Sequence, residues 1–158
     1  YFVPFYDEHN CDLTRPYDGI PELLKALKQK GDEAMRRKGE RLFLAVASNK
    51  YQAATEKIVA HYFPNTFDVV LGERGGIPRK PDPQIGYDIL SSGITSPESG
   101  EETKILYIGD SLVDVETAKA ANVRFVACAW GFCTEEQLRS ADVQHLIHHP
   151  VEILSFVD

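Results

Sequence analysis

Short apolar runs alternate with amphipathic polar segments along this chain of 158 residues. The apolar runs are mostly continuous, which is the pattern of strands buried on both faces of a parallel sheet. They cover residues 42–47, 67–71, 104–108 and 125–129. Helical spacing of apolar residues, as at Leu23, Leu24 and Leu27, recurs in residues 20–29, 51–62, 83–92 and 113–121. Strands that alternate with helices predict an α/β fold with a mostly parallel sheet.

Local signals refine this outline. Pro21 suits the first turn of a helix, where its missing N–H costs nothing. The charged, glycine-punctuated residues 28–41 predict an exposed loop. Thr134 is predicted to cap a short helix whose first turn carries acidic residues, a favourable placement for the helix dipole. Residues 145–147 and 151–156 predict a last short strand and a closing helix.

Composition narrows the functional class. The chain is 43% apolar and 26% charged, with a net charge of -7. This acidity argues against binding to nucleic acid or to anionic membranes. The sequence has no apolar stretch of membrane-spanning length and no visible signal peptide, so we expect a cytoplasmic protein. The odd set of Cys11, Cys128 and Cys133 lacks metal-ligand spacing, and Cys128 is predicted to be a small core residue.

The strongest chemical signal is the sequence KILYIGDSLVD, residues 104–114. A buried strand runs into Gly109, which permits a sharp turn, and Asp110 and Asp114 follow at the carboxyl end of the strand, where open α/β sheets bind ligands. Two carboxylates with this spacing suit Mg²⁺, which prefers oxygen ligands. The alternative interpretation is that Asp110 caps the next helix and Asp114 is solvated.

Polar residues also follow other predicted elements. Ser48 and Asn49 come directly after the apolar run 42–47, and Lys80 precedes Pro81-Asp82-Pro83 at the start of a helix. Together with the carboxylates, a hydroxyl and an ammonium suit phosphoryl transfer, which depends on positioning and charge stabilisation. Taken singly, Ser48 could cap a helix and Lys80 could be a surface charge.

In this order, Ser48, the KPDP of residues 80–83 and the GDSLVD of residues 109–114 resemble the second, third and fourth motifs of the haloacid dehalogenase-like superfamily. The similarity is greatest to its phosphoglycolate phosphatase-like branch. Further support comes from residues 10–19 and from the loop Trp130-Gly131-Phe132.

The resemblance implies a Rossmann-like three-layer sandwich with a mostly parallel sheet. Residues 16–158 would form this α/β core, and residues 1–15 would be the residual end of a helical cap. By the same resemblance, Ser48 and Lys80 are catalytic residues that bind the phosphoryl group, with Asn49 nearby. Asp110 would ligate Mg²⁺, with Asp114 as a further ligand or as support, and Ser111 would be a lesser neighbour.

One departure concerns the first motif of the family, a strand followed by Asp-x-Asp-x-Thr that supplies the nucleophile and the general acid. The segment Asp12-Leu13-Thr14 lacks both the preceding apolar strand and the paired Asp. We therefore expect the chain to be a fragment, inactive by itself and without the central strand of the family's sheet. Because unpaired strand edges associate readily, a separate N-terminal segment or another copy would complete the sheet.

The expected function is that of a Mg²⁺-dependent phosphomonoester hydrolase acting on a small intracellular phosphorylated metabolite, with phosphoglycolate as the first guess. One alternative is a catalytically dead regulatory module that keeps the phosphate and Mg²⁺ pocket. A phosphorylation-receiving signalling domain also has a parallel sheet and an acidic Mg²⁺ site. It would, however, need its phosphorylated Asp at an early strand end, where this chain has Ser48.

Overall fold

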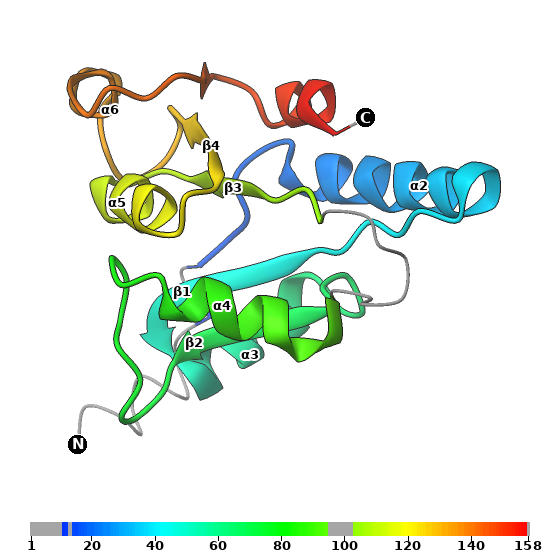
Figure 1. The fold of residues 1–158 in the computed structure, drawn as a ribbon, viewed down its shortest axis with the longest axis horizontal. Helices are drawn as coiled ribbons and strands as arrows, with labels where there is room; N and C mark the ends of the chain where they lie inside the picture. The colour runs from blue at the N-terminus through cyan, green and yellow to red at the C-terminus, as the bar shows by residue number, and fades with distance from the viewer. Residues whose placement is uncertain (1–10, 13, 95–102, 158) are drawn as a thin grey trace. The chain divides into compact units, whose positions relative to one another are not determined.

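The computed structural model describes residues 11–12, 14–94 and 103–157. The chain divides into two compact units, residues 1–77 and 78–158, and each unit contains a parallel sheet of its own (Figure 1). The segment expected to end a helical cap, residues 1–15, lies mostly outside the described residues. Within the described ranges, no helix combines the length and the apolar character needed to cross a membrane.

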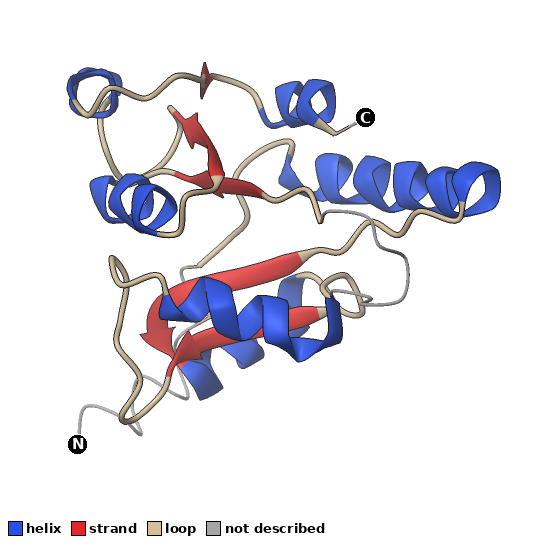
Figure 2. Cartoon of the chain, viewed as in Figure 1, coloured by secondary structure: helices blue, strands red, loops and turns tan. Residues whose placement is uncertain are grey.

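The first unit is built around a pair of parallel strands. Its elements are α2 (Ile20–Lys38), β1 (Ala45–Tyr51), α3 (Gln52–Tyr62) and β2 (Val69–Glu73). Strands β1 and β2 pair in register from Ala45↔Val69 to Ala47↔Leu71, and α3 provides the crossover between them (Figure 2). The predicted alternation of strand and helix is confirmed in this unit.

The prediction that residues 28–41 form an exposed loop is wrong, because α2 continues to Lys38. The segment is rich in strong helix formers, and basic residues in its last turn suit the negative end of the helix dipole. Gly31 is tolerated because it faces Leu42, whose Cβ would lie 3.1 Å from a Cβ at this position. The helix stops at Gly39, which adopts a left-handed conformation with φ of 72°.

Strand β1 also differs from its prediction. It begins three residues later than the apolar run and extends through Tyr51, so Ser48 lies within the strand and not after it. The register shifts between Ala47 and Tyr51, since their partners are Leu71 and Glu73. The extra residues of β1 bulge opposite Gly72, where a Cβ would lie 2.5 Å from the carbonyl oxygen of Lys50. A glycine at position 72 therefore makes the irregular strand end possible.

The second unit contains a three-stranded parallel sheet in the order β3-β4-β5. Its elements are α4 (Gln84–Ile89), the π-helix η1 (Leu90–Ile94), β3 (Leu106–Gly109), α5 (Leu112–Ala120), β4 (Arg124–Cys128), α6 (Glu135–Ser140), β5 (Leu146–Ile147) and the 3-10 helix η2 (Pro150–Phe156). Every element predicted in this unit is present, with bounds shifted by a few residues. Thr134 caps α6 through a capping box with Gln137, as predicted.

The core of the second unit lies where β4 meets α5 and α6. Val115, Ala127 and Leu138 are buried together with Cys133, and Ala127 and Leu138 are fully inaccessible. Cys128 is also buried, which confirms it as a core residue. This packing fixes β3 and β4 side by side, with their carboxyl ends leading into Asp110 and Trp130 respectively.

Candidate functional site

An ion pair buried in the second unit joins Lys80 to Asp114. The ammonium Nζ of Lys80 lies 2.8 Å from Oδ1 of Asp114, and the two side chains are only 11% and 8% exposed. Lys80 belongs to the loop before α4, whereas Asp114 occupies the first turn of α5. The structure thus brings together two of the predicted site residues, and the interpretation of Lys80 as a surface charge is wrong.

The carboxylate of Asp114 accepts hydrogen bonds from several groups besides Lys80. The hydroxyl of Ser111 donates to Oδ2 at 2.6 Å, and the backbone N–H groups of Ser111 and Asp110 donate to the same oxygen at 3.2 and 3.3 Å. The hydroxyl of Tyr107 donates to Oδ1 at 3.2 Å. Because a carboxylate offers about four lone-pair sites, these donors use the capacity of both oxygens.

This arrangement is part of the start of α5. Ser111, and not Asp110 as one interpretation suggested, caps the helix, and its hydroxyl accepts from the backbone N–H of Asp114 in a capping box. Gly109 leaves room for the carboxylate, since a Cβ there would lie 2.6 Å from Cγ of Asp114. The strand, the turn and the helix start therefore fix Asp114 together.

The electrostatic balance at Asp114 favours its charged form. Burial alone would raise the pKa of this carboxyl. The hydrogen bond and the positive charge of Lys80, together with the Ser111 hydroxyl, outweigh burial and lower the pKa below its ordinary value of 3.8. For Tyr107, burial and then the negative charge of Asp114 raise the pKa. Asp114 is therefore an anion and Tyr107 a neutral phenol at neutral pH.

Asp110 is held differently, by the loop that follows β4. The backbone N–H of Phe132 donates to Oδ2 of Asp110 at 2.9 Å, and the backbone carbonyl of Asp110 accepts from the N–H of Cys133 at 3.0 Å. Among the described residues, no group donates to its other oxygen, Oδ1. Asp110 thus keeps one carboxylate oxygen for a ligand.

The negative potential of the two carboxylates reaches the neighbouring strand. Burial raises the pKa of the Cys128 thiol to about 12, and the charges of Asp110 and Asp114 contribute to the increase. A cation placed at this edge would lower the cost of keeping these carboxylates close together.

The donor set fits a magnesium ion at Asp110. Mg²⁺ commonly binds through one or two carboxylates and retains several waters, so it does not need a complete protein cage. Within the described residues, no group of three or more His, Cys, Asp or Glu side chains is arranged for a metal. Asp110 can offer Oδ1 directly, whereas Asp114 would first have to release one of its present donors.

The remaining predicted residues, Ser48 and Asn49, belong to the first unit. The hydroxyl of Ser48 accepts a hydrogen bond of 3.1 Å from the backbone N–H of Lys50. Tyr51 precedes α3 without a side-chain cap, so the alternative that Ser48 caps this helix is wrong. The role of Ser48 and Asn49 beside Lys80 stays a prediction.

Two groups of this site have no clear signal in the sequence. Tyr107 occupies an ordinary strand position and is identified only by its hydroxyl contact with Asp114. The backbone N–H of Phe132 acts without its side chain, which is 87% exposed. Residues 130–132 supported the resemblance to the family. The hydrogen bond from the Phe132 backbone N–H to Asp110 could not be predicted from residue types, because a backbone donor does not depend on the side chain.

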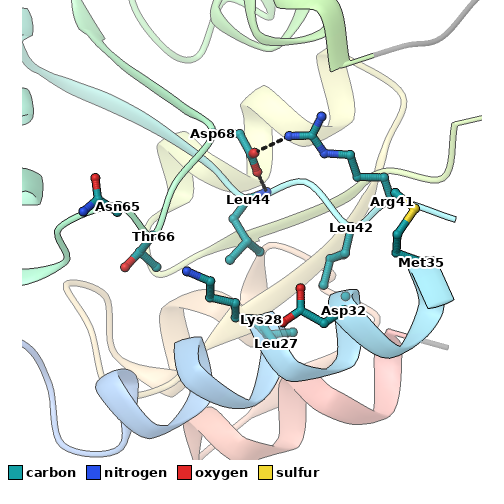
Figure 3. A pocket seen from close by; sticks show the side chains of 11 residues that line it. Leu27, Lys28, Asp32, Met35, Arg41, Leu42, Leu44, Asn65, Thr66 and Asp68 are labelled. Atoms are coloured by element: carbon teal, nitrogen blue, oxygen red, sulfur yellow. Dashed lines mark hydrogen bonds and ion pairs between the residues drawn. The ribbon is translucent and has the colours of Figure 1, made fainter. Parts of the chain in front are cut away.

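The first unit contains a cavity of its own. It has a volume of about 320 Å³ and is lined by α2 and by the segments that lead into β1 and β2. Figure 3 shows Asp68 at its wall, where it accepts from Arg41 at 3.0 Å and from the N–H of Leu44 at 2.9 Å. The cavity therefore adjoins the amino-terminal ends of the strands, whereas α/β ligand sites lie at the carboxyl ends.

Comparison with known proteins places this arrangement in a family. The sequence profile of the haloacid dehalogenase-like hydrolases matches residues 1–128. The chain is 31% identical over 161 residues to an N-acetylmuramic acid 6-phosphate phosphatase of Pseudomonas aeruginosa, covering 99% of this chain and 64% of that protein. It is 28% identical over 150 residues to a phosphoglycolate phosphatase of Mesorhizobium japonicum, covering 94% of this chain and 59% of that protein.

A solved structure has a fold similar to that of this chain. A protein of Lactobacillus delbrueckii subsp. bulgaricus, whose proposed activity is that of a phosphoglycolate phosphatase, superimposes with a TM-score of 0.81 at 31% identity. The match covers 99% of this chain and 59% of that one. The chain therefore spans less than two thirds of the length of these relatives. The motifs, the parallel α/β fold and these matches show that the chain belongs to the haloacid dehalogenase-like hydrolase family.

Proposed function

We propose that this chain carries the phosphate- and Mg²⁺-binding part of a phosphomonoester hydrolase that acts on a small phosphorylated metabolite. The observation that carries the proposal is the pairing of Lys80 with Asp114 at 2.8 Å beside Asp110. This pairing supports the proposal because it holds an ammonium, which would bind phosphate oxygens, in the same unit as a carboxylate with an open oxygen. The named activities of the two relatives, both phosphatases, support the same class of reaction.

Each residue of the site would contact either the phosphate or the metal. The Lys80 ammonium would bind phosphate oxygens and offset their charge, while the Ser48 hydroxyl and the Asn49 amide would complete the phosphate contacts. Asp110 would hold Mg²⁺ through Oδ1, with Asp114 as a further ligand or as support for Lys80. The metal, when bound, supplies Lewis-acid polarisation of the phosphoryl oxygens.

The nucleophile is a separate question. Asp114 accepts hydrogen bonds at both carboxylate oxygens, and the open Oδ1 of Asp110 is the atom that would hold Mg²⁺. Neither carboxylate is then left to act as a nucleophile. This observation favours, as the second candidate, a module that binds phosphate and Mg²⁺ without turnover. In the hydrolase proposal, the first motif of the family would come from a segment other than these residues.

The strand edges suggest where such a segment would bind. Among the described residues, β1 pairs only with β2, and β3 pairs only with β4. A strand from another segment of the protein, or from a second copy, would satisfy the remaining edge of each. Light scattering should then detect dimers or larger species of the 158-residue chain; a monomer with one cooperative melt would contradict this hypothesis.

The function is tested by comparing hydrolysis with binding. With Mg²⁺, the full-length protein should hydrolyse p-nitrophenyl phosphate and should lose this activity with EDTA. The 158-residue chain should bind inorganic phosphate in calorimetry without catalysing hydrolysis. Binding without turnover by both proteins would favour the second candidate, and the absence of phosphate binding from both would reject the proposed site.

The substrate class can be tested with the same protein. 2-Phosphoglycolate and N-acetylmuramic acid 6-phosphate represent the substrates named for the relatives. We expect kcat/KM to be higher for small phosphate monoesters than for a phosphorylated peptide. An equal or higher value for the peptide would argue against a metabolite phosphatase.

A further inference from the structure

Tyr107 and Lys80 donate hydrogen bonds to the same atom. The Tyr107 hydroxyl lies 3.2 Å from Oδ1 of Asp114, and the Lys80 ammonium lies 2.8 Å from that oxygen. The other oxygen, Oδ2, accepts from the Ser111 hydroxyl and from the turn at the start of α5. Tyr107 and Lys80 thus define the Oδ1 side of the carboxylate, while the turn defines the Oδ2 side.

The position of the Tyr107 hydroxyl is set by a regular element. Tyr107 lies on β3 and pairs with Phe125 in the parallel register of β3 and β4. Their ring centroids lie 6.0 Å apart with an interplanar angle of 37°, a contact that restricts the phenol ring. Lys80, by contrast, extends a flexible four-carbon chain from a loop. The rigid partner of Asp114 is therefore Tyr107.

We propose that Tyr107 is a positioning residue for Lys80: its hydroxyl holds Oδ1 of Asp114 where that oxygen directs the ammonium toward a phosphate. The inference rests on the proposed function insofar as Lys80 binds phosphate. It adds a residue outside the motifs that carry the family resemblance. Loss of the hydroxyl would leave Lys80 as the one described donor to Oδ1, and the carboxylate and ammonium could then shift together.

Tyr107→Phe removes the hydroxyl and keeps the ring that contacts Phe125. In calorimetric titration of the 158-residue chain with inorganic phosphate and Mg²⁺, we expect the variant to bind phosphate about three- to tenfold more weakly, the range for one lost hydrogen bond. The matched control is Tyr87→Phe, because Tyr87 lies on α4 in the same unit and is 48% exposed. Its affinity should equal that of the unaltered chain.

A second measurement does not depend on phosphate binding. In the unaltered chain labelled with ¹³Cζ-tyrosine, the Tyr107 resonance can be assigned by substituting the other tyrosines. Lys80→Met should shift this resonance and no other tyrosine resonance. The substitution removes the ammonium that donates to Oδ1 of Asp114, the same oxygen to which the Tyr107 hydroxyl donates. This arm remains informative if Tyr107→Phe fails to fold, since that variant is not required for it.

The outcomes separate the two proposals. If the unaltered chain does not bind phosphate but the Tyr107 resonance responds to Lys80→Met, the positioning contact stands and the proposed function of this chain fails. If a folded Tyr107→Phe binds phosphate with unchanged affinity, the positioning proposal is overturned. An unchanged Tyr107 resonance in folded Lys80→Met overturns it as well.

Discussion

Gly131 lies so close to Asp110 that a Cβ at position 131 would overlap the carboxylate of Asp110. The backbone of the loop after β4 thereby reaches this side chain, and the next residue, Phe132, donates its N–H to Oδ2 at 2.9 Å. Asp110 is oriented by main-chain atoms, so its position depends on the absence of a side chain at position 131.

Gly131→Ala should therefore displace Asp110. We expect a loss of about 1–3 kcal/mol in the free energy of unfolding, because the added methyl overpacks the contact. Mg²⁺-dependent phosphate affinity should fall by about tenfold or more, as for other losses of support around a metal ligand. Urea denaturation and calorimetry measure the two effects. The control is Gly86→Ala, where no atom lies within 4 Å of the added Cβ; equal behaviour of the two variants would contradict this account.

Replacing Lys80 should affect stability as well as binding. Lys80→Met leaves the charge of Asp114 buried without its cation, and such a change costs about 3 kcal/mol or more in the free energy of unfolding. Urea denaturation at neutral pH measures this loss, and calorimetry should show loss of phosphate binding. Lys104→Met alters an exposed lysine of the same unit and should have no comparable effect. If Lys80→Met were as stable as this control, the ion pair would not be the buried contact described here.

The lowered pKa of Asp114 makes a prediction for acid stability. Because the folded-state pKa lies below the ordinary value of 3.8, the unfolded chain takes up this proton first as the pH falls. The stabilisation is present above pH 3.8 and is lost on acidification through the folded pKa. Unfolding free energies measured across this window should decline less steeply for Asp114→Asn than for the unaltered chain. Asp142→Asn, at an exposed position, should reproduce the unaltered slope; a reversed order would show that Asp114 has the opposite shift.

Thiol labelling tests the burial around the site. Burial, with the charges of Asp110 and Asp114, raises the pKa of Cys128 to about 12, so little thiolate forms at neutral pH. With iodoacetamide, native Cys128 should react at least about 100-fold more slowly than in guanidinium, because labelling requires both opening and ionisation. Partly exposed Cys11 should react readily in both states. Fast native labelling of Cys128 would exclude the described packing of β4.

The sequence predicted the second unit well and the first unit less well. In the second unit, β3 and β4 are apolar runs that end at turns, so pattern and structure agree. In the first unit, Gly31 suggested a break, but contact with Leu42 compensates for the weak helix propensity of glycine. Ser48 was expected to lie after the strand because it is the first polar residue after the apolar run 42–47. The bulge opposite Gly72 extends the strand past that point, and a bulge depends on pairing between distant segments.

The candidate site shows the same limit. Motif spacing indicated Lys80, Asp110 and Asp114 because each follows or precedes an element boundary. It could not indicate that Lys80 and Asp114 pair, since this contact joins residues 34 positions apart. Nor could it indicate Tyr107, whose role depends on the direction of one side chain of β3.

Asp114 both helps to start α5 and holds Lys80. Its neighbours Ser111 and Gly109 serve the helix start and the carboxylate at once. A substitution here would weaken the protein and alter its chemistry in the same step. Substitutions that remove phosphate binding but keep the fold would therefore have to start at residues other than Asp114, Ser111 and Gly109. Lys80 is a suitable first position only if the charge of Asp114 is neutralised along with it.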